Sequence, residues 1–139
     1  MSMYPLELVA PMAEDLTDHG FNGLKTVQEV DAFVTEKPGT VLMVVNSVCG
    51  CAAAMARPGV KLAVQNDSKP DHLATVFAGV DVDATNRARE YMLPYPPSSP
   101  CIGLFKDGQL VHMLERHHIE GRSAEMIADN LRQAFDQHC

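Results

Sequence analysis

The sequence has little positive charge and no long apolar run. Its 11 lysines and arginines are outnumbered by 18 acidic residues, the formal net charge is −7 at pH 7, and no basic cluster occurs. This balance argues against nucleic acid or an anionic membrane as the main partner. No stretch is apolar and long enough to span a bilayer, and residues 1–5 lack the features of a signal peptide. We therefore expect a cytoplasmic protein whose thiols are kept reduced.

The chain also lacks a disulfide framework, internal repeats and low-complexity segments. It has four cysteines, namely Cys49, Cys51, Cys101 and Cys139. In a reducing compartment, a chain of 139 residues can build a core without covalent staples. There is no glycine-rich phosphate loop, and no carboxylate pair has the spacing of hydrolase chemistry. We expect residues 1–139 to form a single domain.

The most informative motif is Cys49-Gly50-Cys51. The apolar, β-branched run at 41–45 predicts a buried strand, and the alanine-rich run at 52–56 predicts a helix. Both sulfurs then lie at the first turn of that helix, where free amides and the positive end of the dipole stabilise an anion. The thiolate is the reactive form of cysteine. The motif therefore indicates redox or sulfur-transfer chemistry.

Gly50 fits such chemistry because it lacks a β-carbon. A disulfide between residues two apart closes a small ring and bends the backbone, which glycine tolerates best. Strain makes such a bond easier to reduce and prone to exchange. We therefore interpret a Cys49–Cys51 disulfide as a labile catalytic bond.

Apolar periodicity and turn signals predict an α/β fold. Helices are expected at 4–20, at 26–38 behind a capping box of Thr26 and Glu29, after Cys51 with a kink or split at Pro58, at 83–90, and from Ser123 to about Phe135. Strands are expected at 40–47, 72–80, 101–105 and 110–114, the last two joined by a hairpin turn at 106–109. The Pro-rich segment 94–100 is expected to be an ordered loop. The pattern predicts a mixed central β-sheet flanked by helices on both faces, which is a thioredoxin-like architecture.

Several blocks of the sequence resemble the bacilliredoxins, thioredoxin-fold proteins with a Cys-Gly-Cys site. The most specific block is VVNSVCGCA at 44–52. The others are ARP at 56–58, TVFAG at 75–79, SSP at 98–100, RHHIEG at 116–121 and AFDQHC at 134–139. The resemblance covers essentially the whole chain.

The resemblance implies thiol–disulfide exchange that removes bacillithiol, a small cysteinyl thiol, from oxidised client proteins. It makes Cys49 the attacking thiol and Cys51 the second thiol, with no cofactor beyond bacillithiol as substrate or co-substrate. Ser99 and Pro100 match the position of the cis-proline that faces the site in thioredoxin folds, and the Ser99 backbone would pair with a substrate strand.

Three further residues or groups are candidates for supporting roles. Cys101 occupies a position that is often serine in the family; if Pro100 borders the site, Cys101 lies near the thiols, although a small buried residue of the core is the plainer interpretation. Arg57 can raise the positive potential near the thiols, or be an ordinary surface arginine. The group at 116–118 can present cations to an anionic substrate, or be a solvated strand end.

Three alternatives remain open at this stage. The protein can be a disulfide isomerase or oxidant rather than a reductase of mixed disulfides, which the reduction potential distinguishes. It can bind a soft metal through the two thiols, completed by residues drawn from Cys101, His117, His118 and Cys139, although the usual zinc spacing is absent. It can also be an interaction module in which the cysteines are incidental. We predict no metal site.

Overall fold

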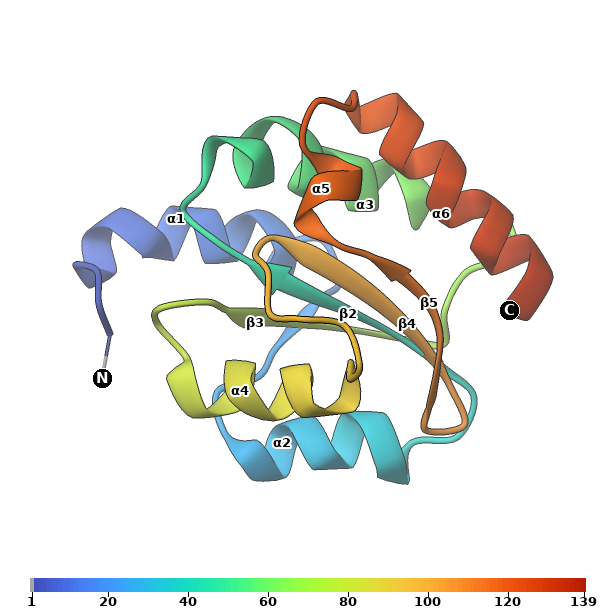
Figure 1. The fold of residues 1–139 in the computed structure, drawn as a ribbon, viewed down its shortest axis with the longest axis horizontal. Helices are drawn as coiled ribbons and strands as arrows, with labels where there is room; N and C mark the ends of the chain where they lie inside the picture. Colours follow the sequence, from blue (N-terminus) through green and yellow to red (C-terminus); the bar gives the residue numbers. More distant parts are fainter. Residues whose placement is uncertain (1) are drawn as a thin grey trace.

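The computed structural model of the chain describes residues 2–139. A five-stranded sheet with the strand order β1-β3-β2-β4-β5 lies at its centre (Figure 1). The strands are β1 (Asn22–Gly23), β2 (Thr40–Asn46), β3 (His72–Phe77), β4 (Cys101–Lys106) and β5 (Gln109–Leu114). β1, β3 and β2 run parallel, whereas β4 is antiparallel to both β2 and β5. The mixed sheet predicted from the sequence is therefore confirmed.

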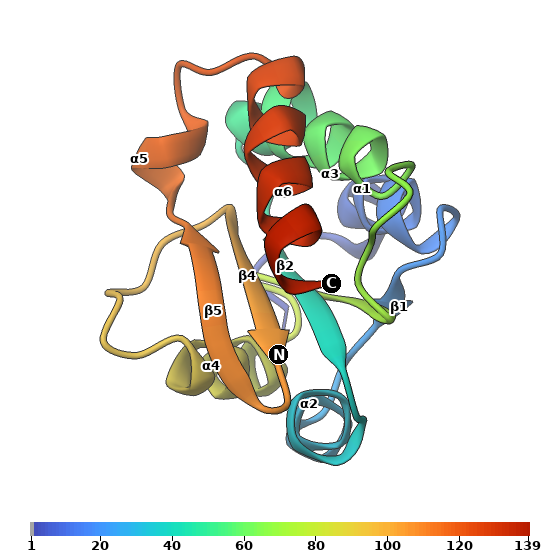
Figure 2. The ribbon, with the colours of Figure 1, turned by 90° about the vertical axis from the view of Figure 1, so that its right-hand side faces the viewer.

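Helices cover both faces of this sheet (Figures 1 and 2). One face carries α1 (Leu6–Thr17), α3 (Arg57–Ala63), the short α5 (Arg116–Ile119) and α6 (Ala124–His138). The other face carries α2 (Val27–Asp31) with its π-helical continuation η1 (Ala32–Glu36), and α4 (Val82–Tyr91). A second π-helical segment, η2 (Ala52–Ala56), leads directly into α3. The α/β class with helices on both faces is confirmed.

β2 is the central strand, and all seven of its residues are buried. Successive side chains of a strand point to opposite faces. Accordingly, Leu42 and Val44 join one apolar cluster, while Val41, Met43 and Val45 join the other. This explains why the strand appears in the sequence as a continuous apolar run rather than an alternating one.

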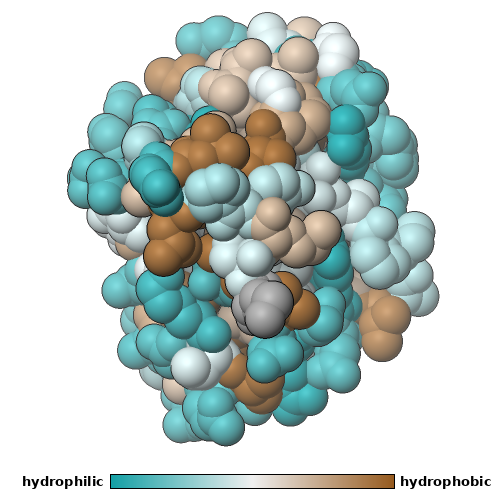
Figure 3. Space-filling model, turned by 90° about the vertical axis from the view of Figure 1, so that its left-hand side faces the viewer, coloured by the Kyte–Doolittle hydropathy of each residue, from teal (hydrophilic) through white to brown (hydrophobic). Residues whose placement is uncertain are grey.

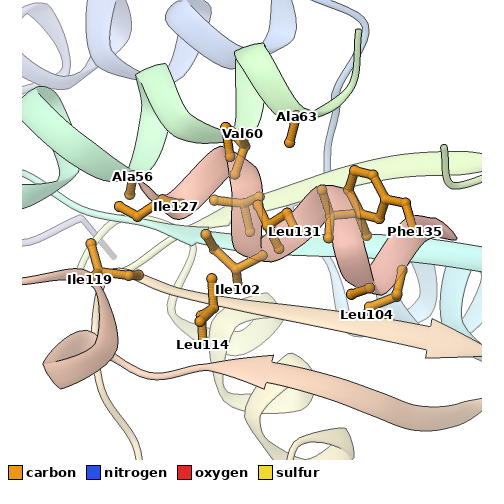
Figure 4. Packing of buried hydrophobic residues seen from close by; sticks show 14 of the residues in the cluster. Ala56, Val60, Ala63, Ile102, Leu104, Leu114, Ile119, Ile127, Leu131 and Phe135 are labelled. Atoms are coloured by element: carbon orange, nitrogen blue, oxygen red, sulfur yellow. The ribbon is translucent and has the colours of Figure 1, made fainter. Parts of the chain in front are cut away.

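The larger cluster lies between the sheet and the layer of α3 and α6 (Figure 4). Ile102 and Leu104 of β4 meet Val60 of α3 and Leu131 and Phe135 of α6 there. Gly59 allows the two helices to approach closely. A β-carbon at this position would lie 2.7 Å from Cγ2 of Ile127.

Local signals in the sequence produce the expected caps and turn. The Thr26 hydroxyl accepts a hydrogen bond from the Glu29 amide at 3.1 Å, and the Thr26 amide donates to the Glu29 carboxylate at 3.1 Å, which is the predicted capping box. The Ser123 hydroxyl caps α6 by accepting from the Met126 amide at 3.2 Å. Asp107 and Gly108 both have positive φ, at 49° and 83°, as a tight turn between β4 and β5 requires.

Some predicted boundaries and positions were wrong. β3 ends at Phe77 rather than at residue 80, and α6 continues past Phe135 to His138. Two elements, β1 and α5, were not predicted from the sequence; they are only two and four residues long. The helical spacing of four apolar residues predicts that they share one buried face of α6, namely Met126, Ile127, Leu131 and Phe135. Met126 is instead 52% exposed. Next to Pro58 the helix that follows Cys51 is divided into two elements: the π-helical η2 ends at Ala56, and the α-helical α3 begins at Arg57, with the proline in its first turn.

No helix formed by residues 2–139 combines the length and the apolar character needed to cross a membrane.

Candidate active site

Two free thiols face each other just beyond the carboxyl end of β2. The sulfurs of Cys49 and Cys51 are 2.6 Å apart, and the Cys51 amide donates a hydrogen bond to the Cys49 sulfur at 3.4 Å. Cys49 is partly exposed, whereas Cys51 is only 7% exposed. The Cys49 carbonyl accepts from the amides of Ala52 and Ala53, which begins the helix that follows. Cys49 is thus the accessible thiol of the pair, at the helix start that the sequence predicted.

The surroundings shift the two pKa values in opposite directions. The pKa of Cys49 is lowered, mainly because the Cys51 thiol donates to its sulfur, and the positive charge of Arg116 adds to the effect. The pKa of Cys51 is raised, first by burial and then by the neighbouring Cys49 sulfur. Cys49 is therefore the thiol that ionises first, and Cys51 is the one that stays protonated and supplies the hydrogen bond.

Gly50 lies between the two thiols on the surface. A β-carbon at Gly50 would meet no atom within 4 Å, and its φ is not in the left-handed region. In the dithiol form of the site, the backbone does not require glycine here.

A buried arginine fixes the segment that leads to Cys49. Nη1 of Arg57 donates to Oδ1 of Asn46 at 2.9 Å and to the Ser47 carbonyl at 3.2 Å. Nε of Arg57 donates to the Asp15 carboxylate at 3.2 Å, and Lys61 donates to the other oxygen of Asp15 at 2.6 Å. The Ser47 hydroxyl accepts from the Cys49 amide at 3.2 Å. These contacts tie the turn to α1 and α3.

Of the two interpretations of Arg57, the one that makes it an ordinary surface arginine is therefore wrong. Its side chain is 7% exposed and its guanidinium is paired with Asp15. The sequence did not show that Arg57 is buried. An arginine is buried only with a partner for its charge, and that partner, Asp15 of α1, lies 42 residues earlier in the chain. The structure shows Arg57 holding the backbone of the turn.

Ser99 and Pro100 lie beside this turn. The peptide bond between them is cis. In the antiparallel register, Val45 of β2 faces Cys101 of β4, so the residues just before β4 adjoin those just after β2. Pro100 is buried, and Ser99 is partly exposed.

Arg116 connects the cis-proline loop with the thiols. Its Nη1 donates to the Ser99 carbonyl at 3.4 Å, and its amide donates to the Ser98 hydroxyl at 3.3 Å. Its charge lowers the pKa of both Cys49 and Cys51. Within the group at 116–118 that the sequence offered as cations, Arg116 is therefore a residue whose charge acts on the thiols.

Comparison of the sequence with known proteins identifies the family of the chain. The family described as disulphide isomerase matches residues 4–139. A bacilliredoxin from Cytophaga hutchinsonii is 60% identical over 135 residues, which span 97% of this chain and 99% of the relative. A bacilliredoxin from Koribacter versatilis is 51% identical over 99% of this chain and 94% of its own length. The chain belongs to the bacilliredoxin family. A solved thioredoxin from Fasciola hepatica has a TM-score of 0.61 at 19% identity, covering 86% of this chain and 100% of that one, and shows the thioredoxin fold.

The other two cysteines lie apart from the thiol pair. Cys101 is 1% exposed in the cluster on the α2 and α4 side of the sheet, with its sulfur 3.9 Å from that of Met92. Burial raises the pKa of Cys101 to about 12. Cys139 is exposed at the end of α6. Cys101 thus occupies the core position that the sequence analysis considered the plainer interpretation.

The soft-metal alternative finds no complete ligand set at the thiols. Within residues 2–139, the one group of three or more side chains close enough to share an ion is Glu115, His117 and His118, and it contains no cysteine. Nδ1 of His118 already accepts a hydrogen bond from the Glu115 amide at 3.0 Å. Family, fold and a two-thiol site together support a redox role of the thiol–disulfide oxidoreductase type.

Proposed function

We propose that this protein exchanges thiols and disulfides at Cys49 and Cys51 and removes bacillithiol, or a similar small thiol, from mixed disulfides on client proteins. The observation that carries the proposal is the opposite shift of the two pKa values within one hydrogen-bonded pair. In such a pair one cysteine is the thiolate that attacks a disulfide, and the other stays protonated until it resolves the mixed disulfide that forms. The relatives named bacilliredoxin support bacillithiol as the small thiol.

The first step transfers the small thiol to the protein. The Cys49 thiolate attacks the small-thiol sulfur of the mixed disulfide; a new S–S bond forms, the old one breaks, and the client cysteine leaves as a thiolate that takes up a proton. Because Cys49 is partly exposed and Cys51 is buried, the first attack is assigned to Cys49.

The second step clears the adduct. Cys51 loses its proton and attacks the Cys49 sulfur, which releases the small thiol and leaves a Cys49–Cys51 disulfide. A second molecule of small thiol can instead attack the adduct and leave as the symmetric disulfide. In the first route, two electrons from an external thiol reductant return the pair to the dithiol form.

Ser99 and Pro100 are proposed to bind the client segment beside the reacting sulfurs. The support is their position next to the turn and the partial exposure of Ser99, whose backbone could pair with an extended segment. Figure 3 shows the end of the molecule where β2 ends and α1 begins, with apolar residues among polar ones, which suits contact with a protein client. A reducing compartment, the cytoplasm, is the setting in which such chemistry recurs.

The proposal is tested by mass spectrometry with a client that carries bacillithiol on one cysteine. With no free small thiol added, the Cys51→Ala variant should free the client thiol and keep the bacillithiol on Cys49, because neither Cys51 nor a second small thiol is present to resolve the adduct. The Cys49→Ala variant should transfer nothing. An adduct on Cys51 in the Cys49→Ala variant, with normal release of the client, would reverse the assignment.

The description of the matched family as disulphide isomerase favours a second candidate, the rearrangement of protein disulfides. The reduction potential of the Cys49–Cys51 couple separates the two functions. A potential near those of glutaredoxins, roughly −200 to −230 mV, suits removal of small thiols, whereas a markedly higher one suits isomerisation or oxidation.

A further inference from the structure

Arg116 is a charged group at the active site whose only part in the exchange described so far is to lower the pKa of the two thiols. Its side chain is 45% exposed. Its Nη1 donates to the Ser99 carbonyl of the cis-proline loop at 3.4 Å, and its backbone amide donates to the Ser98 hydroxyl at 3.3 Å. The third hydrogen bond, from Nε, goes to the Glu120 carboxylate at 2.9 Å. The guanidinium therefore stands at the border between the loop and solvent.

The position of Arg116 is set by a well-anchored element. Ile119, at the end of α5, is fully buried and joins the cluster that contains Ala56 and Ile127 (Figure 4). At the start of α5, the Glu115 side chain accepts from the His118 amide, and the His118 ring accepts from the Glu115 amide. Both ends of this short helix are thus fixed, so the arginine does not depend on a loose loop for its placement.

Arg116 is the exposed one of the three arginines around the site; Arg89 is only partly exposed, and its Nη2 donates to the Ser98 carbonyl at 3.4 Å. Arg57 is buried and bonded to Asp15, Asn46 and Ser47, which uses its donors inside the protein. Arg116 acts on both thiols and is open to solvent. Its partner Glu120 is 59% exposed, and an ion pair this exposed to solvent is weak, so a second carboxylate can compete for the guanidinium.

We propose that Arg116 is a specificity-determining residue that binds a carboxylate on the small-thiol half of the mixed disulfide. This inference rests on the proposed exchange at Cys49. A guanidinium presents several N–H donors in a planar fork that suits a carboxylate. A small thiol joined to Cys49 lies within the field of this guanidinium, so a carboxylate on it replaces Glu120 as the partner of Arg116 during the transfer.

The test compares two substrates that differ only in charge. A client peptide is capped through a disulfide with N-acetylcysteine, which has a carboxylate, or with N-acetylcysteine amide, which is neutral. The ratio of kcat/KM for the acid over the amide is measured. Wild type should favour the acid by about threefold, as expected for a partly exposed ion pair. The Arg116→Gln variant should bring the ratio to about one, and Arg116→Lys should retain part of the preference.

The ratio separates recognition from nucleophile activation. Loss of the Arg116 charge also raises the pKa of Cys49, but that slows attack on both substrates alike. Arg122→Gln is the matched control, since Arg122 is an exposed arginine after α5, and within the described residues the hydrogen bonds of the cis-proline loop come from other arginines; it should leave the ratio unchanged. Glu120→Gln, which removes the competing carboxylate, should increase the preference for the acid.

Two results would overturn the inference in different ways. Equal processing of acid and amide by wild type, or an unchanged preference in Arg116→Gln, removes the role of Arg116 and leaves the exchange function standing. Release of neither client thiol by wild type, with both disulfides intact, removes the exchange function and the inference with it.

Discussion

Nη1 of Arg57 lies 2.9 Å from Oδ1 of Asn46, and the same oxygen accepts the Ser47 amide at 2.9 Å. Asn46, the last residue of β2, thus accepts one hydrogen bond from α3, which follows the thiols, and one from the turn that connects β2 to the thiols. The Asn46 amide group completes the link by donating to the Met12 carbonyl of α1 at 3.1 Å. One asparagine side chain therefore joins three elements around the redox turn.

This arrangement makes Arg57→Met a test of how the turn is held. The variant leaves the Ser47 carbonyl without its donor and Oδ1 of Asn46 with the Ser47 amide alone, and it should lower the free energy of unfolding by about 2 kcal/mol, a value reduced because Asp15 is partly exposed. It should also raise the pKa of Cys49, because a looser turn weakens the hydrogen bonds to its sulfur. Urea unfolding and the thiolate absorbance at 240 nm measure the two effects. Lys61→Met, which keeps Arg57 on Asp15, should leave the thiolate signal as in wild type.

The second prediction concerns the pH dependence of Cys49. Its lowered pKa means that alkylation by iodoacetamide should rise with pH around a midpoint below that of an ordinary cysteine. The largest cause is the hydrogen bond from Cys51, so Cys51→Ala should move the midpoint to higher pH. Arg116→Gln should move it in the same direction by less. A midpoint that stays in place in Cys51→Ala would contradict the assigned cause.

The third prediction separates Cys101 from the reaction. Because burial raises its pKa to about 12, Cys101 should resist alkylation at pH 8 in the folded protein and react only after denaturation. Cys101→Ala should retain exchange activity and lose about 1 kcal/mol of stability through the small cavity it leaves. Peptide mapping after labelling, with and without denaturant, shows which cysteines react. Loss of turnover in a folded Cys101→Ala protein would give this thiol a part in the mechanism.

The fourth prediction contrasts two glycines. Gly59→Ala should destabilise the protein by about 1–3 kcal/mol, since the added methyl group would lie 2.7 Å from Cγ2 and 2.9 Å from Cβ of Ile127. Gly50→Ala, which meets open space, should change the stability of the dithiol form by less than about 0.5 kcal/mol. Thermal unfolding in the presence of a reductant compares the two. Equal losses would show that α3 and α6 can shift to accept the methyl group.

Much of the fold follows from local signals that the sequence displays openly. Three local signals agree with the structure that the whole domain adopts: the capping box at Thr26, the Asp107-Gly108 turn and the apolar run of β2. β1 and α5 were missed because so few residues give no detectable period. They are held by their neighbours: β1 by pairing with β3, and α5 by the burial of Ile119.

The site was predictable where it depends on neighbours in sequence and unpredictable where it depends on distant ones. Cys49 and Cys51 are marked by their own spacing. The role of Arg57 depends on Asp15, and that of Arg116 depends on a loop 17 residues earlier in the chain. The helical period predicted a buried Met126 because it identifies an apolar stripe but not the limits of that stripe, and Met126 lies outside its buried part.

The complete burial of β2 has a consequence for motion at the site. Amides in a central strand with both faces covered exchange with solvent only when the whole domain unfolds, so β2 should be among the slowest segments in hydrogen–deuterium exchange. The thiols stand at the end of this strand, whereas the turn that bears them touches solvent. We therefore expect oxidation and reduction to change the backbone conformation of residues 47–51 while the hydrogen bonds of the sheet stay intact. Water then does not enter the core during turnover.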